Sequence, residues 1–321
     1  MRKIFVFSIF LMFFFSLQAQ RMPEYHGQTL KDIVKESDEN IDIGMWALII
    51  AKEYDNSVDV EKYLSELDGM ASEIKRMLAG RTSDMDKFLA IRTFLYDAEK
   101  WNDENPFSYD LEDPLGNELR HQLLCDYMDS RKGNCVSMPT LFIALMERVD
   151  PSVQFVGVKA PLHMFCRLRD RQTGDVWNVE ATNGGNPARN QWYIDEMGIS
   201  QKAVDSQLYL KDLTPREYIS ALTGVLIAKE RRDGNFEKAM EYTDLALKLS
   251  PDSDMALVSK GALYAEIGHK ASETHELTKE EKEYYKSESE KYINKAKSLG
   301  WQPESKAQRE EYMKTVKTAQ R

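Results

Sequence analysis

Cysteine is scarce in this 321-residue chain, which contains only Cys125, Cys135 and Cys166. Three cysteines are too few for a disulfide-stapled scaffold, and an odd number leaves at least one thiol unpaired within the chain. A disulfide between Cys125 and Cys166 would spare Cys135, although nothing in the sequence requires that pairing. A hydrophobic core must therefore hold the fold together, and Cys135 is a candidate free thiol.

The chain also lacks the patterns of metal, nucleotide and nucleic-acid sites. Its five histidines show no HExxH or other metal-ligand spacing. The Gly-rich stretch "NGGNPARNQW" follows a strand pattern without a phosphate-loop sequence, which indicates a loop beside a site. The net charge of −10 argues against binding to nucleic acid or to anionic lipid. We therefore expect no metal, no cofactor and no nucleic-acid partner.

Long apolar runs are confined to the beginning of the chain. "MRKIFVFSIFLMFFFSLQAQ" has two basic residues, a short apolar run and small residues, which is the pattern of a secretory signal peptide cleaved after Ala19. No cysteine lies near that position to anchor a lipoprotein. The sequence predicts an exported protein, periplasmic or secreted, whose mature chain has no integral membrane segment.

Hydrophobic periodicity divides the chain into regions. We predict a signal peptide (1–19), a helical N-terminal region (20–101), a mixed core (102–212), a repeat region (213–302) and a C-terminal tail (303–321). In the N-terminal region Asp59 and Ser83 are predicted N-caps and Gly80 a predicted C-cap. The core begins with a polar Pro/Gly loop (102–117), followed by a helix containing "ELRHQLLCDYM".

The region 213–302 carries small residues, a turn and a proline at the positions of tetratricopeptide repeats. The residues concerned are Gly234, Ala239, Ala246, Pro251, Gly261, Tyr264 and Gly268. A charged helical insertion, "HKASETHELTKEEKEYYKSES", stretches the second repeat. Two repeats are few for a free-standing solenoid, so we expect them to pack on the core and to offer a surface for a protein partner.

Chain geometry brings a histidine to the candidate thiol. A helix over 135–149 is about 22 Å long, and the following strand "VQFVGVK" covers a similar length. If the strand runs antiparallel to the helix, the chain returns at Pro161 and places His163 near Cys135. Pro139 fits the first turn of this helix only if the helix begins at or after about Cys135; otherwise it kinks the helix.

An acidic residue joins this pair through a hairpin. Centring the turn on Gln172 and Thr173 pairs Phe165 with Glu180, so His163 and Glu180 become diagonal neighbours on one face. Asn178 shares that face and is the competing orienting residue. Cys125 and Cys166 alternate into apolar faces and are predicted to be structural.

These segments resemble the transglutaminase-like superfamily, a branch of the papain-like cysteine enzymes. "GNC" resembles its nucleophile segment, "PLHMFCRL" its histidine strand, and "WNVEAT" the strand of its acid, usually Asp followed by Pro-Thr. The resemblance extends to the SirB-type bacterial subgroup, which has a helical N-terminal region and C-terminal tetratricopeptide repeats. It implies an α+β fold in which a nucleophile helix packs on a small antiparallel sheet, with Cys135 as nucleophile, His163 as base and Glu180 as orienting acid.

Two functions follow from the resemblance. In the first, the chain is a cysteine hydrolase or acyltransferase that attacks an amide or peptide carbonyl and forms a thioester. The Cys135 N–H and a side-chain donor, Gln122, Asn134 or Trp101, would then bind the oxyanion. In the alternative, it is a catalytically inactive scaffold that binds a peptide or protein partner, because many members of that subgroup lack the cysteine.

Overall fold

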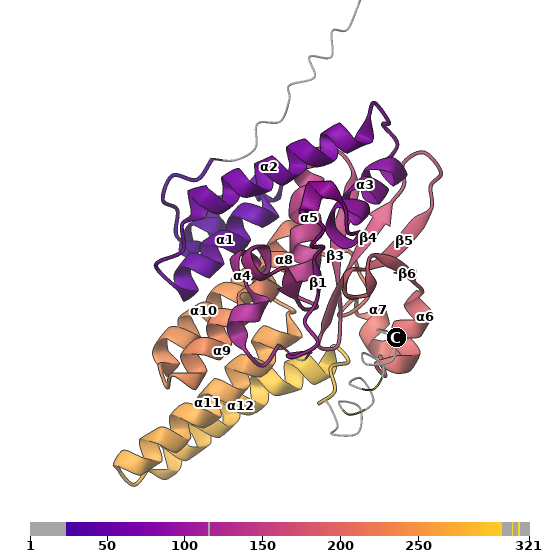
Figure 1. The fold of residues 1–321 in the computed structure, drawn as a ribbon. Helices are drawn as coiled ribbons and strands as arrows, with labels where there is room; N and C mark the ends of the chain where they lie inside the picture. Colours follow the sequence, from indigo (N-terminus) through magenta and orange to yellow (C-terminus); the bar gives the residue numbers. More distant parts are fainter. Residues whose placement is uncertain (1–23, 115, 304–309, 311–313, 315–321) are drawn as a thin grey trace, which may run out of the picture.

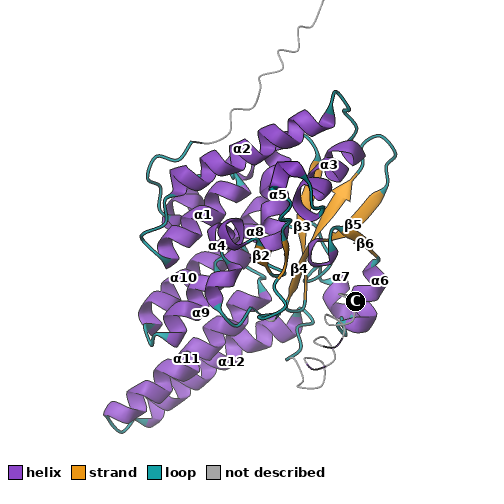
Figure 2. Cartoon of the chain, in the orientation of Figure 1, coloured by secondary structure: helices purple, strands orange, loops and turns teal. Residues whose placement is uncertain are grey.

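The computed structural model describes residues 24–114, 116–303, 310 and 314. The predicted signal peptide and nearly all of the predicted C-terminal tail lie outside the described residues. Within them the chain is α+β: helices surround a small antiparallel sheet, as the sequence predicts (Figures 1 and 2).

The N-terminal region is helical, as predicted. It contains the 3-10 helices η1 (Leu30–Lys35) and η2 (Asp38–Asn40), then α1 (Ile43–Tyr54), α2 (Val60–Leu78) and α3 (Asp84–Tyr96). Asp59 and Ser83 are the N-caps of α2 and α3, and each accepts a backbone N–H three residues ahead. The predicted C-cap was wrong by one residue: Ala79, in the left-handed conformation with φ 48°, ends α2, and Gly80 follows it.

The centre of the core is α5 (Ser137–Val149), which is buried along most of its length. Helices α1, α2, α3 and α4 (Leu124–Ser130) pack around it. The sheet has the order β3 (Gln154–Ala160), β4 (His163–Arg169), β5 (Val176–Glu180) and β6 (Asn186–Ala188), all antiparallel. Strand β6 lies in a segment predicted as a loop; that prediction was wrong, because its backbone completes the free edge of β5.

The sheet separates two apolar clusters. The main core includes side chains from the face of the sheet toward α5, among them Phe155, Cys166 and Leu168. The second cluster includes side chains from the opposite face, among them Val158 and Phe165. That second cluster lies under α6 (Asn190–Glu196) and α7 (Gln201–Asp205). In β4 and β5, Cys166 pairs with Val179 and Arg167 with Asn178, which is the predicted register.

The segment before α5 is more broken than predicted. It holds η3 (Lys100–Asn102), β1 (Ser108–Tyr109), η4 (Leu119–Gln122) and β2 (Lys132–Gly133), with β1 parallel to β2. The single helix predicted through "ELRHQLLCDYM" is wrong, because Leu123 is extended and separates η4 from α4. Leu123 is buried, so tertiary packing outweighs helical periodicity here.

The C-terminal region consists of helices that pack on the core. They are α8 (Pro215–Leu222), α9 (Gly224–Arg232), α10 (Phe236–Leu249), α11 (Asp254–Thr274) and α12 (Lys279–Ser298). Ile219, Leu226 and Leu249 share one apolar cluster with Trp46 of α1. The predicted charged insertion forms the far part of the α11–α12 hairpin, which projects from the body (Figure 1).

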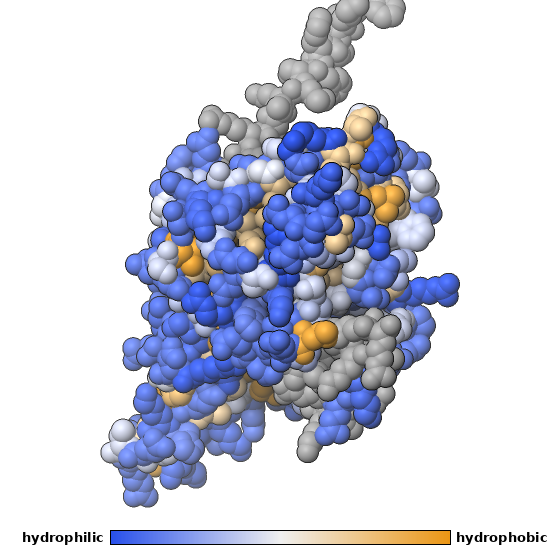
Figure 3. Space-filling model, in the orientation of Figure 1, coloured by the Kyte–Doolittle hydropathy of each residue, from blue (hydrophilic) through white to orange (hydrophobic). Residues whose placement is uncertain are grey.

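The glycines of α11 permit this hairpin to close. A Cβ on Gly261 would lie 2.8 Å from the Ile293 side chain and 2.9 Å from the Ser289 carbonyl oxygen. A Cβ on Gly268 would lie 2.9 Å from the Tyr285 ring. The surface in Figure 3 is mostly hydrophilic, the hairpin included. None of the helices in the described part of the chain is long and apolar enough to span a membrane.

Candidate active site

Cys135 lies two residues before α5 in a loop held by its neighbour. The Asn134 side-chain oxygen accepts the backbone N–H of Val136 at 2.9 Å and of Ser137 at 3.3 Å. These are the bonds of a residue that caps a helix, and α5 begins at Ser137, two residues after the predicted Cys135. Pro139 falls within the first turn, where no intrahelical N–H is needed, so it does not kink the helix.

His163 and Glu180 form a buried pair beside this loop. His163 is the first residue of β4 and Glu180 the last of β5. His163 Nε2 is 2.8 Å from Glu180 Oε2, and the two residues are 4% and 7% exposed. Cys135 lies close enough to the imidazole to help raise the pKa of His163. Cys135 itself is half-buried, and its Sγ lies 3.7 Å from the Leu162 carbonyl oxygen.

Two residues missed in the sequence analysis hold Glu180 in place. Its Oε1 accepts the Thr182 hydroxyl at 2.6 Å, and its Oε2 accepts the Tyr193 hydroxyl at 2.9 Å. Tyr193 comes from α6, and its ring stacks on Phe165 with centroids 4.1 Å apart. Tyr193 directly follows the stretch predicted as a loop, and no predicted element covered it. Thr182 was visible only as a neighbour of the acid.

The charges of the pair stabilise each other. Burial lowers the pKa of His163, but the charge of Glu180 and the hydrogen bonds with Cys135 and Glu180 outweigh it and raise that pKa to about 10. Burial raises the pKa of Glu180, but the charge of His163 and the surrounding hydrogen bonds bring it below its usual value. At neutral pH the site therefore holds an imidazolium and a carboxylate, with the imidazolium next to the sulfur.

Two other predicted site residues, Asn178 and Gln122, bond to groups other than Cys135 and His163. Asn178 accepts Arg167 Nε at 2.7 Å and donates to Asn190 at 2.7 Å, so its amide is engaged away from His163. Gln122 donates to the Gly116 carbonyl at 2.9 Å. Trp101 lies in η3, which packs on α3, and we do not place it in the site.

Two donors near Cys135 are free among the described residues. The Cys135 backbone N–H donates no hydrogen bond there. The side-chain nitrogen of Asn134 is buried and has no partner in the same set of residues. The Asn134 nitrogen lies against Gly116, where it is shielded from solvent, so the Cys135 N–H beside the half-buried thiol is the donor that a ligand oxygen can reach.

The remaining cysteines differ from Cys135. Cys125 and Cys166 are buried and unpaired, so the described structure contains no disulfide between them. Burial raises the pKa of Cys125 to about 12, and it also raises that of Cys166. Both side chains lie in the main apolar core, as predicted. Their thiols are protonated and shielded at neutral pH.

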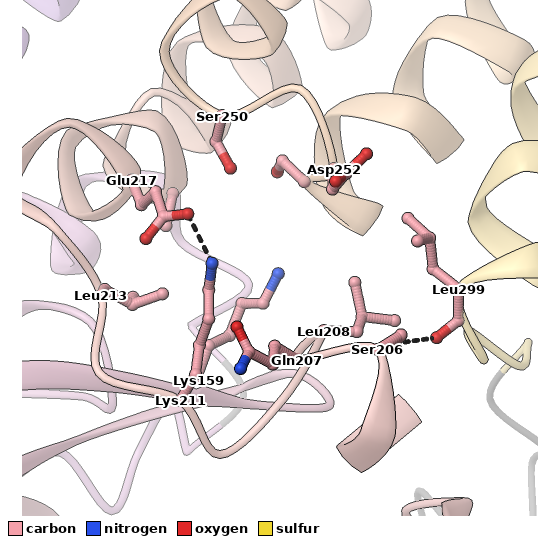
Figure 4. A pocket seen from close by; sticks show the side chains of 12 residues that line it. Lys159, Ser206, Gln207, Leu208, Lys211, Leu213, Glu217, Ser250, Asp252 and Leu299 are labelled. Carbon is pink, nitrogen blue, oxygen red and sulfur yellow. Dashed lines mark hydrogen bonds and ion pairs between the residues drawn. The ribbon is translucent and has the colours of Figure 1, made fainter. Parts of the chain in front are cut away.

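A separate cavity of about 140 Å³ lies where the sheet meets the C-terminal helices (Figure 4). Its lysines are already paired within the protein: Lys211 bonds to Glu217, and Lys159 bonds to Asp254 beside the cavity. The cavity is not lined by Cys135, His163 or Glu180. Among the described residues, no group of three or more His, Cys, Asp or Glu side chains could hold a metal ion.

Comparison with known proteins agrees with this geometry. The family described as "Transglutaminase-like superfamily" matches residues 61–223, a range that includes Cys135, His163 and Glu180. A "UPF0162 protein" of Xylella fastidiosa (strain 9a5c) is 21% identical over 251 residues, which is 75% of this chain and 84% of that protein. Its counterpart in strain Temecula1 is 21% identical over 249 residues, covering 75% and 83%. No solved structure matches significantly. By its family match, the chain belongs to the transglutaminase-like superfamily.

Proposed function

We propose that the chain is a cysteine-dependent hydrolase or acyltransferase that acts on the carbonyl of an amide or peptide. Members of the superfamily are usually cysteine-based enzymes. The observation that carries the proposal is the position of His163, which bonds to Glu180 and directly follows Leu162, whose carbonyl oxygen is 3.7 Å from Cys135 Sγ. A histidine placed between a thiol and a buried carboxylate is the arrangement that nucleophilic catalysis requires.

The reaction follows from these positions. The Cys135 thiolate attacks the carbonyl carbon, and the oxyanion is received by the Cys135 N–H. The C–N bond then breaks, and the leaving amine takes a proton from the His163 imidazolium. A thioester remains on Cys135. Neutral His163 next removes a proton from water, the hydroxide attacks the thioester, and the C–S bond breaks to release the acid.

Hydrolysis is favoured over transfer to an amine. Because Cys135 is only half-buried, water reaches the thioester. Transfer would need a second site that positions an amine and excludes water. A peptide or protein is the proposed substrate class, which is plausible for the fold.

Alkylation by iodoacetamide tests the proposed nucleophile. At pH 7 we expect the reagent to modify Cys135 in the folded wild-type protein and to leave Cys125 and Cys166 unmodified, because both are buried. Cys135→Ala should lose the modification, whereas the control Cys125→Ala should keep it. Peptide mass spectrometry locates the modified residue. Equal labelling of wild type and Cys135→Ala would contradict the enzyme and favour the inactive scaffold.

We further propose that α9–α12 are two tetratricopeptide-like repeats of a SirB-type protein. The small side chains predicted at the helix contacts support this, since Ala239 and Ala246 are fully buried and Gly261 lies against α12. The repeat region would hold a protein partner or guide a protein substrate to the thiol.

Export is the remaining part of the proposal, and it rests on the pattern of residues 1–19. We expect the mature protein to be found in the periplasm or the medium, with Gln20 as its first residue. Cell fractionation followed by N-terminal sequencing measures this. Recovery of the full-length chain from the cytoplasm, beginning at its first methionine, would contradict the proposed export.

A further inference from the structure

An exposed leucine stands beside the candidate nucleophile. Leu162 lies in the turn between β3 and β4, directly before His163, and the residue is 70% exposed. Its carbonyl oxygen is 3.7 Å from Cys135 Sγ. A molecule that places a carbonyl carbon at this sulfur must therefore also approach Leu162.

The backbone of Leu162 adopts a conformation that leucine rarely takes. Its φ is +54°, in the left-handed region. Ala160 pairs with His163, so Pro161 and Leu162 are the two central residues of the turn. Proline followed by a left-handed residue is the pattern of a type II turn, in which glycine or asparagine is favoured at the second position. A leucine here is unfavourable for the turn itself.

Burial does not compensate for this conformation. Leu210 is also left-handed, with φ +62°, but it is 8% exposed and belongs to the second apolar cluster. The other left-handed non-glycine residues in the described structure are small or polar: Ala79, Asp103, Glu104, Arg131 and Gln207. Leu162 is the one left-handed residue among those described that combines a large apolar side chain with solvent exposure. Folding therefore does not explain its presence.

We propose that Leu162 is a specificity residue, which contacts an apolar group of the substrate next to the carbonyl that Cys135 attacks. This inference rests on the proposed function and names its substrate class: peptides or amides with an apolar side chain adjacent to the reacting carbonyl. Binding of such a group removes the Leu162 side chain from water, which is the burial that the free protein lacks. Unfavourable backbone at an active site is commonly retained for such a role.

Two alkylating reagents with the same reactive group test this proposal. Iodoacetamide is small and polar, whereas N-benzyl iodoacetamide adds an apolar ring. The measured quantity is the ratio of the second-order rate constants of the two reagents at Cys135. We expect this ratio to fall at least about threefold in Leu162→Gly and Leu162→Asn, because a lost apolar contact weakens discrimination by a factor of this order. Both replacements tolerate the left-handed turn, so folding is not at risk.

Two further variants make the outcome decisive. Leu162→Met keeps an apolar side chain and should retain most of the wild-type ratio. Leu89→Asn replaces an exposed leucine on α3 and should leave the ratio unchanged. An unchanged ratio in Leu162→Gly and Leu162→Asn overturns the proposal, and so does an equal loss in Leu162→Met, because the apolar character of the side chain would then not determine the ratio. If the proposed function is wrong, iodoacetamide itself will not label wild-type Cys135. That result differs from failure of the Leu162 proposal alone, in which Cys135 is labelled and the ratio does not change.

Discussion

Replacing His163 with alanine is expected to slow the alkylation of Cys135 by iodoacetamide at pH 6 by at least about tenfold. The thiolate is the reactive form, and an unassisted thiol is only about 0.3% ionised at this pH. In the wild type the charged imidazole of His163 is near the sulfur, and alanine removes both this charge and the base. Stopped-flow or mass-spectrometric rates over a range of pH measure the effect.

The pH dependence distinguishes this explanation from simple loss of structure. The pKa of His163 is raised to about 10, so the ring keeps its charge at neutral pH and loses it as the pH rises through that value. The difference between wild type and His163→Ala should therefore be largest at low pH and should disappear above about pH 9, where an unassisted thiol ionises by itself. His269→Ala, on the exposed α11, is the matched control and should behave as wild type. A constant difference at every pH would rule out the charge effect.

Replacing Glu180 with alanine should lower the free energy of unfolding by about 3 kcal/mol near pH 6. The variant leaves the buried imidazolium of His163 without its counter-charge, and the hydroxyls of Thr182 and Tyr193 lose their acceptor. Urea-induced unfolding followed by circular dichroism measures the loss. Glu66→Ala, at a half-exposed helix position where Glu66 pairs with Lys62 at the surface, is the control and should change stability by less than about 0.5 kcal/mol.

The loss from Glu180→Ala should depend on pH in a defined direction. The pKa of Glu180 is lowered in the folded protein, so its contribution is present above the unfolded value of about 4.5 and is lost as the pH falls below it. The pKa of His163 is raised, so its contribution is complete below about 6.5 and is lost as the pH rises through about 10. The difference from wild type should be largest between about pH 4.5 and 6.5. A difference that grows toward pH 10 would contradict the ion pair.

The register of the hairpin was predictable because it depends on local rules. A period of two and a short turn leave few pairings between β4 and β5, and the observed pairing of Arg167 with Asn178 is the predicted one. The same register carries His163 and Glu180 to one face. Chain length then brings His163 back to Cys135, since α5 and β3 cover similar distances in opposite directions.

The surroundings of the pair were not predictable from local rules. Tyr193 reaches Glu180 from α6, a short helix that follows an edge strand with no alternating pattern. Arg167 draws Asn178 away from His163, although Asn178 and Glu180 occupy equivalent faces of β5. Side chains from other elements determine whether Glu180 or Asn178 bonds to His163. The spacing of residues along the chain does not predict the positions of those side chains.

The α+β class came from the family resemblance, whereas local sequence was sufficient for the N-caps Asp59 and Ser83, the hairpin register and the approach of His163 to Cys135 and Glu180. These features follow from periodicity, turn length and capping, which act over a few residues. Tertiary structure alone decided that Glu180 rather than Asn178 holds His163, and that Leu162 is left exposed in a left-handed turn. Each of these depends on burial and on contacts between distant segments, which determine the stability of a polar or apolar group only after the chain has folded.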